Sequence, residues 1–245
     1  HYPREYMAAL LTSVLDSQGK IAEYIAECRS LGIRLLPPDI NQSGPDFTVA
    51  GRDIRFGLAA LKGVGRGFTN AVLARRQADG PFTSFPDFCQ RLLDEDLNKR
   101  VLESLIRAGA FDAMGVRRSQ LLDAYEQLID SLTRNRRKNL EGQFDLFSLG
   151  QEKPEPVELV LRDLPEFSQE ELMTMEKEVT GLYLSGHPMD AYRDTVRAQG
   201  AVPIASVLED FAQEEGPTQF QDGQRILLAG VVAAAKTKTT KNNSL

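Results

Sequence analysis

The residues of this chain whose types and spacing suggest chemistry would bind an anion rather than break a bond. They are glycines and basic residues in one short stretch: Lys62, Gly63, Val64, Gly65, Arg66 and Gly67. Glycine accepts positive φ angles, and its missing Cβ lets the backbone come close to a ligand. A helix beginning just after these glycines would point its first N–H groups and its positive dipole end outward. With Lys62 and Arg66 beside it, that helix start predicts a phosphate-binding site.

Two short helices are needed to hold this loop. An apolar turn at Leu58 and Leu61 precedes the glycines, and one helical face follows at Phe68, Ala71, Val72 and Arg75. Two helices joined by Gly-x-Gly are typical of the helix-hairpin-helix, a motif that grips the DNA backbone without reading bases. The alternative is an ordinary corner between two helices, in which the glycines only make a tight turn.

A second unit of the same kind follows, with a less typical turn. Asn98 is expected to cap a helix that ends at Gly109-Ala110-Phe111, and Arg117 opens a long amphipathic helix. Ala110 and Phe111 replace the second glycine, so close backbone approach is in doubt there. Contact with DNA would then depend on charge, from Arg107, Arg117 and Arg118. Packing between helices explains this second unit as well as DNA contact does.

Composition argues against a metal or catalytic site within the chain. The two cysteines, Cys28 and Cys89, form no C-x-x-C pair, and the only histidines are His1 and His187. The longest apolar run, 226–235, is far too short to cross a membrane. We therefore expect no catalytic residue, no metal ligand, no membrane contact and a cytoplasmic location.

Charge is distributed unevenly along the chain, whose net charge is −6. Residues 52–76 hold six Lys or Arg and one acid, and Arg134–Lys138 is a compact basic cluster. Residues 152–178 hold nine acids and three bases. This asymmetry predicts basic contact surfaces on an acidic body.

The first fifty-six residues combine helices with short strands. Apolar spacing predicts helices within 6–29, interrupted near Gly19, then a strand at 33–36 and a β-hairpin at 47–56. Asp39 is expected to stabilise a turn, because no second carboxylate stands near it at catalytic spacing. The fold class predicted for the whole chain is mainly α.

Several longer segments resemble one known family. They are Tyr2–Thr12, Gly32–Asn41, Phe56–Gly65, Gly80–Phe88, Leu105–Asp112 and Gly181–Pro188. In this order they are similar to the bacterial replicative DNA polymerase III alpha subunits, and the similarity covers nearly the whole chain. It implies four parts: 1–48, the end of a fingers domain; 49–132, a tandem helix-hairpin-helix domain; 133–178, a linker; and 179–245, a junction and the start of an OB-fold. The first OB strand is expected at 225–236.

The resemblance also implies what this chain takes part in. Such enzymes perform DNA-templated synthesis by two-metal phosphoryl transfer, with Mg²⁺ held by a palm domain whose carboxylates this chain lacks. We therefore expect a piece of a longer polymerase, inactive alone and without a cofactor of its own. The expected partners are duplex DNA (the primer-template), the sliding clamp and other replisome subunits.

One short apolar peptide lies within the predicted linker and is flanked by polar sequence. Its residues are Gln143, Phe144, Asp145, Leu146 and Phe147. It resembles the linear peptide by which replicative polymerases dock on the sliding clamp, where Leu146 and Phe147 would fill an apolar pocket. The alternative is a loop that folds these two residues back onto the helical domain.

Two other functions fit part of the pattern. In a DNA glycosylase, a similar hairpin precedes a catalytic aspartate by about twenty residues, and Asp87 stands near that distance. A non-enzymatic adaptor could also bind DNA and a ring-shaped partner. The segment before residue 50, with its resemblance to polymerase fingers, favours the polymerase over both.

Overall fold

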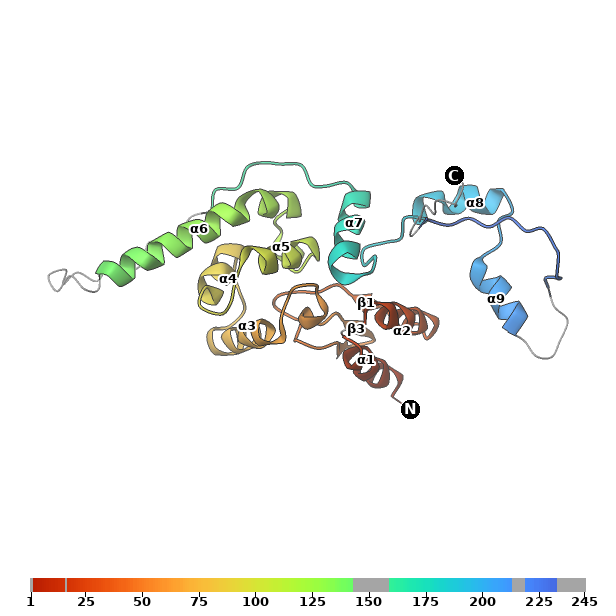
Figure 1. The fold of residues 1–245 in the computed structure, drawn as a ribbon, viewed down its shortest axis with the longest axis horizontal. Coiled ribbons are helices and arrows are strands. Elements are labelled where there is room, and N and C mark those ends of the chain that lie inside the picture. Colours follow the sequence, from red (N-terminus) through yellow and green to blue (C-terminus); the bar gives the residue numbers. More distant parts are fainter. Residues whose placement is uncertain (1, 16, 143–158, 213–218, 233–245) are drawn as a thin grey trace, which may run out of the picture. The chain divides into compact units, whose positions relative to one another are not determined.

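The structure is a computed structural model that describes residues 2–15, 17–142, 159–212 and 219–232. The chain divides into two compact units, 1–185 and 186–245, which are described separately below (Figure 1). Helices dominate it, as the sequence predicts. The division into two units differs from the four parts expected from the resemblance, because residues 159–185 pack into the first unit.

The first unit begins with two helices and a small sheet. Helices α1 (Pro3–Ser13) and α2 (Gln18–Ser30) confirm the predicted helical region and its interruption. Strands β1 (Leu35–Leu36), β2 (Thr48–Ala50) and β3 (Asp53–Arg55) form a sheet of order β1-β3-β2. β1 runs parallel to β3, and β2 pairs antiparallel with it in the predicted hairpin. The sheet spans residue 48, so backbone hydrogen bonds cross the domain boundary expected there.

The turn at Asp39 is also as predicted. Its carboxylate accepts hydrogen bonds from the Asn41 backbone N–H at 2.7 Å and from the Gln42 side chain at 2.8 Å. The side chain is buried together with Ser43, whose hydroxyl donates to the Phe56 carbonyl at 2.8 Å. This turn therefore holds the β1 segment against the chain that leads into the first hairpin.

The first helix-hairpin-helix unit follows the sheet. Its first helix is a single 3-10 turn, η1 (Leu58–Ala60), because Gly57 and Leu61 on either side have extended backbones. Its second helix is α3 (Arg66–Asp79), and α4 (Phe85–Leu92) connects it to the next unit. Ser84 caps α4 by accepting from the Asp87 N–H at 3.2 Å.

The second unit of the tandem consists of α5 (Lys99–Arg107), the 3-10 turn η2 (Asp112–Met114) and α6 (Arg118–Gly142). Asn98 caps α5 through the Val101 N–H at 3.0 Å, as predicted. The linker is expected to begin at residue 133, but α6 continues to Gly142. The basic cluster 134–138 therefore lies on a helix.

An acidic segment returns over the second unit of the tandem. Residues 159–168 are irregular and lead into α7 (Gln169–Thr180), which opens with a capping box between Ser168 and Glu171. Helix α7 lies beside α5 and buries Met173 and Val179 (Figure 1). We refer to residues 159–180 as the acidic strap.

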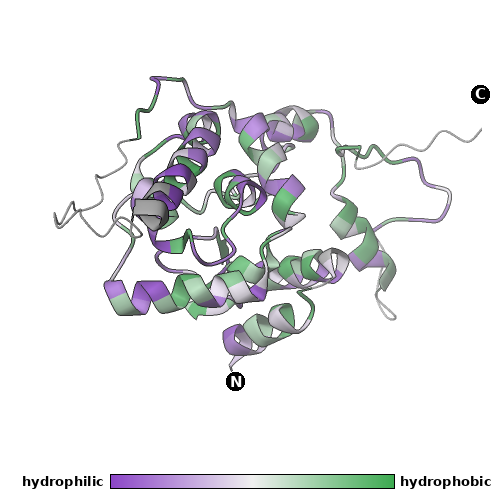
Figure 2. Ribbon diagram, turned by 60° about the vertical axis from the view of Figure 1, so that its left-hand side comes forward, coloured by the Kyte–Doolittle hydropathy of each residue, from purple (hydrophilic) through white to green (hydrophobic). Residues whose placement is uncertain are grey.

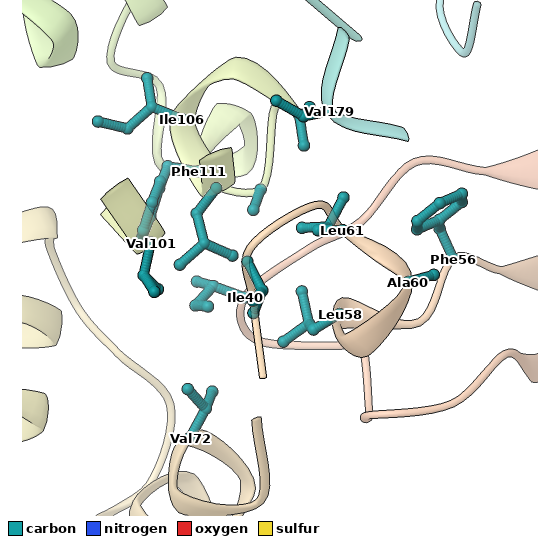
Figure 3. Close-up of a cluster of buried hydrophobic side chains, with 14 of the residues drawn as sticks. Ile40, Phe56, Leu58, Ala60, Leu61, Val72, Val101, Ile106, Phe111 and Val179 are labelled. Atoms are coloured by element: carbon teal, nitrogen blue, oxygen red, sulfur yellow. The ribbon is translucent and has the colours of Figure 1, made fainter. Parts of the chain in front are cut away.

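One hydrophobic core joins all these elements. It takes one face of each amphipathic helix, visible as the alternation of hydrophobic and hydrophilic colour along the ribbons (Figure 2). Its centre holds four phenylalanine rings in edge-to-face contact, Phe82, Phe85, Phe88 and Phe111. Leu58 and Leu61 of the first hairpin lie close to Val101, Phe111 and Val179 (Figure 3). The two hairpins and the strap are therefore parts of a single packed body.

The second compact unit contains η3 (Asp190–Tyr192), α8 (Arg193–Ala198) and α9 (Ile204–Ala212). The strand expected from residue 225 is not formed in the described part, 225–232. Within this unit, the Leu227 carbonyl accepts a hydrogen bond from the Val202 N–H at 2.8 Å. A strand needs a ladder of such backbone hydrogen bonds with a neighbouring strand. In the regions the structure describes, no helix is both long and apolar enough to span a bilayer.

Candidate nucleic-acid interface

The first hairpin turns its apolar residues inward and its glycines outward. Leu61 and Val64 are buried and fix the loop to the core, whereas Gly63, Gly65 and Gly67 are exposed. Gly63 has φ +79°, in the left-handed region that favours glycine. The predicted loop geometry is therefore present, and the backbone between two buried anchors faces solvent.

The start of α3 is open to a ligand. Its N-cap, Gly65, has an extended backbone and provides no side-chain hydrogen bond to the first turn. The first N–H groups of a helix have no acceptor within the helix, and they carry its positive dipole end. A Cβ at Gly65 or Gly67 would meet no atom within 4 Å. An anion can therefore approach the backbone here without displacing a side chain.

The two basic residues predicted beside this loop differ in their surroundings. Arg66 makes a two-pronged ion pair with Asp46, at 2.6 Å and 3.2 Å, and both side chains are partly exposed. The Lys62 side chain is exposed and forms no ion pair with any residue that the structure describes. Lys62 is instead held by its backbone, whose N–H donates to the Val179 carbonyl at 2.8 Å. The charge of Lys62 is therefore available to a ligand, while its backbone is held in place.

Three of the other four basic residues of the stretch 52–76 are engaged within the protein. Arg55 donates to Pro37 and Gln42, Arg75 pairs with Glu95, and Arg76 donates to the carbonyls of Ile40 and Ser43. The basic character that the sequence shows for this stretch thus overstates the positive charge that a ligand would meet.

Arg100 is a residue at this hairpin that the sequence patterns do not identify. It belongs to the first turn of α5, and its Nε lies 3.2 Å from the position that a Cβ would take at Gly63. Its side chain is exposed. No local signal connects it with the first hairpin, because only the packing of the two units brings α5 to that loop.

The second hairpin has the same backbone turn but is closed. Gly109 has φ +80°, nearly the angle of Gly63. Ala110 and Phe111, which replace the second glycine, are each 1% exposed, and the Phe111 ring packs on Phe85 and Phe88. A Cβ at Gly109 would lie 2.3 Å from Nη2 of Arg118. Protein atoms therefore occupy the space that a ligand would need.

The three arginines predicted to give this second hairpin its charge are all paired with carboxylates. Arg107 contacts Glu103 at 2.9 Å and Glu178 at 2.6 Å, and Arg117 contacts Asp163 at 2.7 Å. Three of the carboxylates that pair with these arginines, Asp163, Glu176 and Glu178, belong to the acidic strap. This arrangement favours structural roles over the DNA contacts that the sequence suggests.

Arg118 is the most enclosed of the three. Its side chain is 7% exposed and contacts Asp112 at 2.6 Å and Glu176 at 3.1 Å. Burial opposes its charge, but the hydrogen bonds and charges of these two carboxylates prevail and raise the pKa of Arg118 above its ordinary value. Arg118 therefore stabilises the interior, where a DNA phosphate cannot reach it.

Glu166 of the strap occupies the start of α6. Its carboxylate accepts from the backbone N–H groups of Arg118 at 2.8 Å, Ser119 at 3.1 Å and Phe167 at 2.9 Å. Burial disfavours the carboxylate, but these donors prevail and lower the pKa of Glu166. At the second hairpin, a carboxylate of the same chain thus takes the place that a phosphate could take at the first.

Several other predictions concern residues away from the hairpins. The peptide Gln143–Phe147 lies outside the described residues. In the part of the chain that is described, no three His, Cys, Asp or Glu residues are grouped to hold a metal ion. Both cysteines are buried, and burial raises their pKa values. His187 accepts a hydrogen bond at Nδ1 from Met189 N–H at 3.1 Å within its turn.

Asp87 is the residue on which the glycosylase alternative depends. Its Oδ2 accepts from the Thr83 N–H at 2.9 Å and lies 3.4 Å from Nη1 of Arg91, one turn further along α4. These contacts hold the start of α4. They occupy the carboxylate that a glycosylase would need for its chemistry.

Comparison with known proteins agrees with this geometry. The family model for the helix-hairpin-helix motif matches residues 32–121. DNA polymerase III subunit alpha of Mycobacterium tuberculosis is 37% identical over 245 residues, and those of Saccharopolyspora erythraea and Thermus aquaticus are 36% and 38% identical over 249 residues. These matches cover 99–100% of this chain but only 19–20% of the relatives. The chain is therefore related over almost its whole length to DNA polymerase III subunit alpha, and it spans about one fifth of the length of that subunit.

Proposed function

We propose that this chain is the part of a replicative DNA polymerase that holds duplex DNA and tethers the enzyme to its sliding clamp. The observation that carries the DNA-binding part is the open start of α3 behind Gly63 and Gly65. There, exposed backbone and the Lys62 charge face solvent between buried anchors. Nucleotide addition would belong to other parts of the polymerase, and this chain alone would be inactive.

The contact made at this hairpin would be to phosphates of the primer-template backbone. Backbone N–H groups and a lysine at a helix start carry no means of reading bases, so binding should not depend on sequence. It should depend strongly on salt, because each neutralised phosphate releases counterions. We place this contact at the first hairpin alone, since the second is closed by Phe111, Arg118 and Glu166.

Two substitutions test the hairpin by different physical effects. Lys62→Ala removes charge, and the slope of log K against log salt for duplex binding should fall by about 0.9, the value for one phosphate. Gly65→Leu keeps all charges, and its backbone angles suit any residue, but its side chain would block the approach of a phosphate. Fluorescence anisotropy with labelled duplexes of two unrelated sequences measures both effects.

Gly19→Leu is the matched control for Gly65→Leu. Gly19 lies at the start of another helix, α2, and a Cβ there would likewise meet no atom within 4 Å. This control should bind duplex DNA like the parent chain. If Gly65→Leu also binds like the parent, the hairpin does not contact DNA.

Docking on the sliding clamp rests on the sequence of Gln143–Phe147 and on the family relationship. Purified clamp should capture the 245-residue chain, and Leu146→Ala/Phe147→Ala should abolish capture because both apolar anchors are lost. Gln151→Ala/Lys153→Ala, a few residues further along the same polar stretch, is the control and should be captured. Capture of the Leu146/Phe147 variant would contradict this assignment.

A further inference from the structure

Helix α5 of the second unit meets the first hairpin with two residues of one face. Ser104 donates its hydroxyl to the Lys62 carbonyl at 2.8 Å. Arg100, one turn earlier, runs along Gly63, with its Cγ and Cδ each 3.8 Å and its Nε 3.2 Å from the Cβ position of that glycine. Residues four apart lie on the same side of a helix. α5 is therefore held to the loop by Ser104 and presents the Arg100 guanidinium beside it.

The charge of Arg100 is not compensated within the described protein. Its neighbour Lys99 is bound by Glu126 and Asp130, each at 3.2 Å. The Arg100 side chain is exposed and forms no ion pair or hydrogen bond with any residue in the described ranges. This sets it apart from Arg66, Arg107, Arg117 and Arg118, all of which meet carboxylates.

The position of Arg100 is also unfavourable for its own helix. Lys99 and Arg100 are the first two residues of α5, and no acidic residue lies in that turn. Positive charge at a helix start opposes the helix dipole. A bound anion beside Arg100 would offset this unfavourable interaction with the helix dipole.

We propose that Arg100 is a further phosphate-binding residue of the first hairpin site. This inference rests on the proposed function and deepens it. The second unit of the tandem then takes part in DNA binding through the start of its first helix, while its own turn is closed. The guanidinium group is planar and can donate two parallel hydrogen bonds to one phosphate. It would bind a phosphate beside the phosphate that we propose at the start of α3. Gly63 has a second role here, because a side chain would press on Arg100.

Duplex binding by the 245-residue chain tests this with a charge series. Arg100→Ala should weaken binding about fivefold at moderate salt and reduce the salt slope by about 0.9. Arg100→Lys should keep the slope, because the charge remains. Arg29→Ala, an exposed arginine on α2, is the control and should leave the slope unchanged.

Thermal unfolding separates DNA contact from a structural role. Loss of Arg100 should leave Tm unchanged or raise it, because a charge that opposes the helix dipole is removed. A lower Tm together with an unchanged salt slope would overturn the proposal.

The outcomes also separate this inference from the proposed function. If Lys62→Ala lowers the slope and Arg100→Ala does not, the hairpin site stands and Arg100 is not part of it. If neither changes the slope, both proposals fail. If Arg29→Ala lowers the slope as much as Arg100→Ala, the effect is one of net charge, and the assignment of Arg100 is wrong.

Discussion

Gly63 and Gly109 show how one backbone turn can serve two purposes. Their φ angles, +79° and +80°, are almost equal. Gly63 faces solvent, and the atoms nearest to its Cβ position belong to the flexible Arg100 side chain, whereas Gly109 is covered by Arg118 and Asp112. The first glycine therefore keeps backbone accessible, and the second makes room for a buried ion pair.

The crowding at Gly109 predicts that substitution there destabilises the protein more than substitution at Gly115, another glycine of the second unit. Gly115→Ala should cost about 1 kcal/mol, because φ is +74° but nothing lies within 4 Å of the new methyl group. Gly109→Ala should cost about 3 kcal/mol or more, since the methyl group also displaces the guanidinium of Arg118. Urea unfolding of the two variants measures this, and equal costs would contradict the crowding at Gly109.

Glu176 is the carboxylate that connects the strap to the interior. It is 1% exposed, contacts Arg118, and accepts from the backbone N–H groups of Leu184 at 3.0 Å and Ser185 at 2.9 Å. It thereby joins α7, the second hairpin and the turn that follows α7.

Glu176→Gln should therefore destabilise the first compact unit by about 2–3 kcal/mol, because Arg118 loses a charged acceptor in the interior. Glu170→Gln, at an exposed position of the same helix, should change stability by less than about 0.5 kcal/mol. Urea unfolding measures both. A small effect at Glu176 would mean that Asp112 alone compensates Arg118.

At the scale of elements, the two hairpins differ in how the following helix begins. The start of α3 has no side-chain cap, and the start of α6 is capped by Glu166. A carboxylate accepting helix N–H groups stabilises the helix through hydrogen bonds and through the dipole. Only the first helix start is left for a ligand.

The cap on α6 predicts a pH-dependent stability difference. The pKa of Glu166 is lowered in the folded chain, so its contribution is present above the unfolded-state pKa of about 4.3 and is lost as the pH falls through the folded value. Glu166→Gln should cost about 0.5–1 kcal/mol at neutral pH. In acid, where the parent is protonated too, urea unfolding should show the difference closing. A difference that persists in acid would argue against a charged cap.

At the scale of the first compact unit, the acidic strap engages the basic residues around the second hairpin. Asp163, Glu166, Glu176 and Glu178 all contact the second hairpin or its helices. The acidic and basic segments noted in the sequence therefore neutralise each other there. At the first hairpin, Lys62 and Arg100 lie beyond the contacts of the strap carboxylates.

This distribution predicts that the turn of the second unit, with Arg107 and Arg117 beside it, contributes nothing measurable to duplex binding. Arg107→Ala and Arg117→Ala should leave the salt slope of the 245-residue chain at its parent value, because both guanidinium groups are engaged by carboxylates. Anisotropy titrations beside Lys62→Ala provide the comparison. A slope reduced by either substitution would show that the strap releases its arginines when DNA binds.

Much of the local structure was predictable because it depends on neighbouring residues. The cap at Asn98 and the turn at Asp39 follow from side chains within a few positions of the backbone that they satisfy. The loop at 63–65 follows from the conformational freedom of its glycines. The extent of α6 was less predictable, because its polar final turns have no clear apolar periodicity.

The sequence by itself thus determined the helices, the hairpin turns and the family to which the chain is related. Only the tertiary structure decided which basic residues remain available to DNA. Arg66 meets Asp46, Arg107 meets Glu178 and Arg117 meets Asp163, whereas Arg100 reaches Gly63 without a carboxylate. The physical reason is that an ion pair depends on where the chain returns in space, and spacing along the chain does not encode that path.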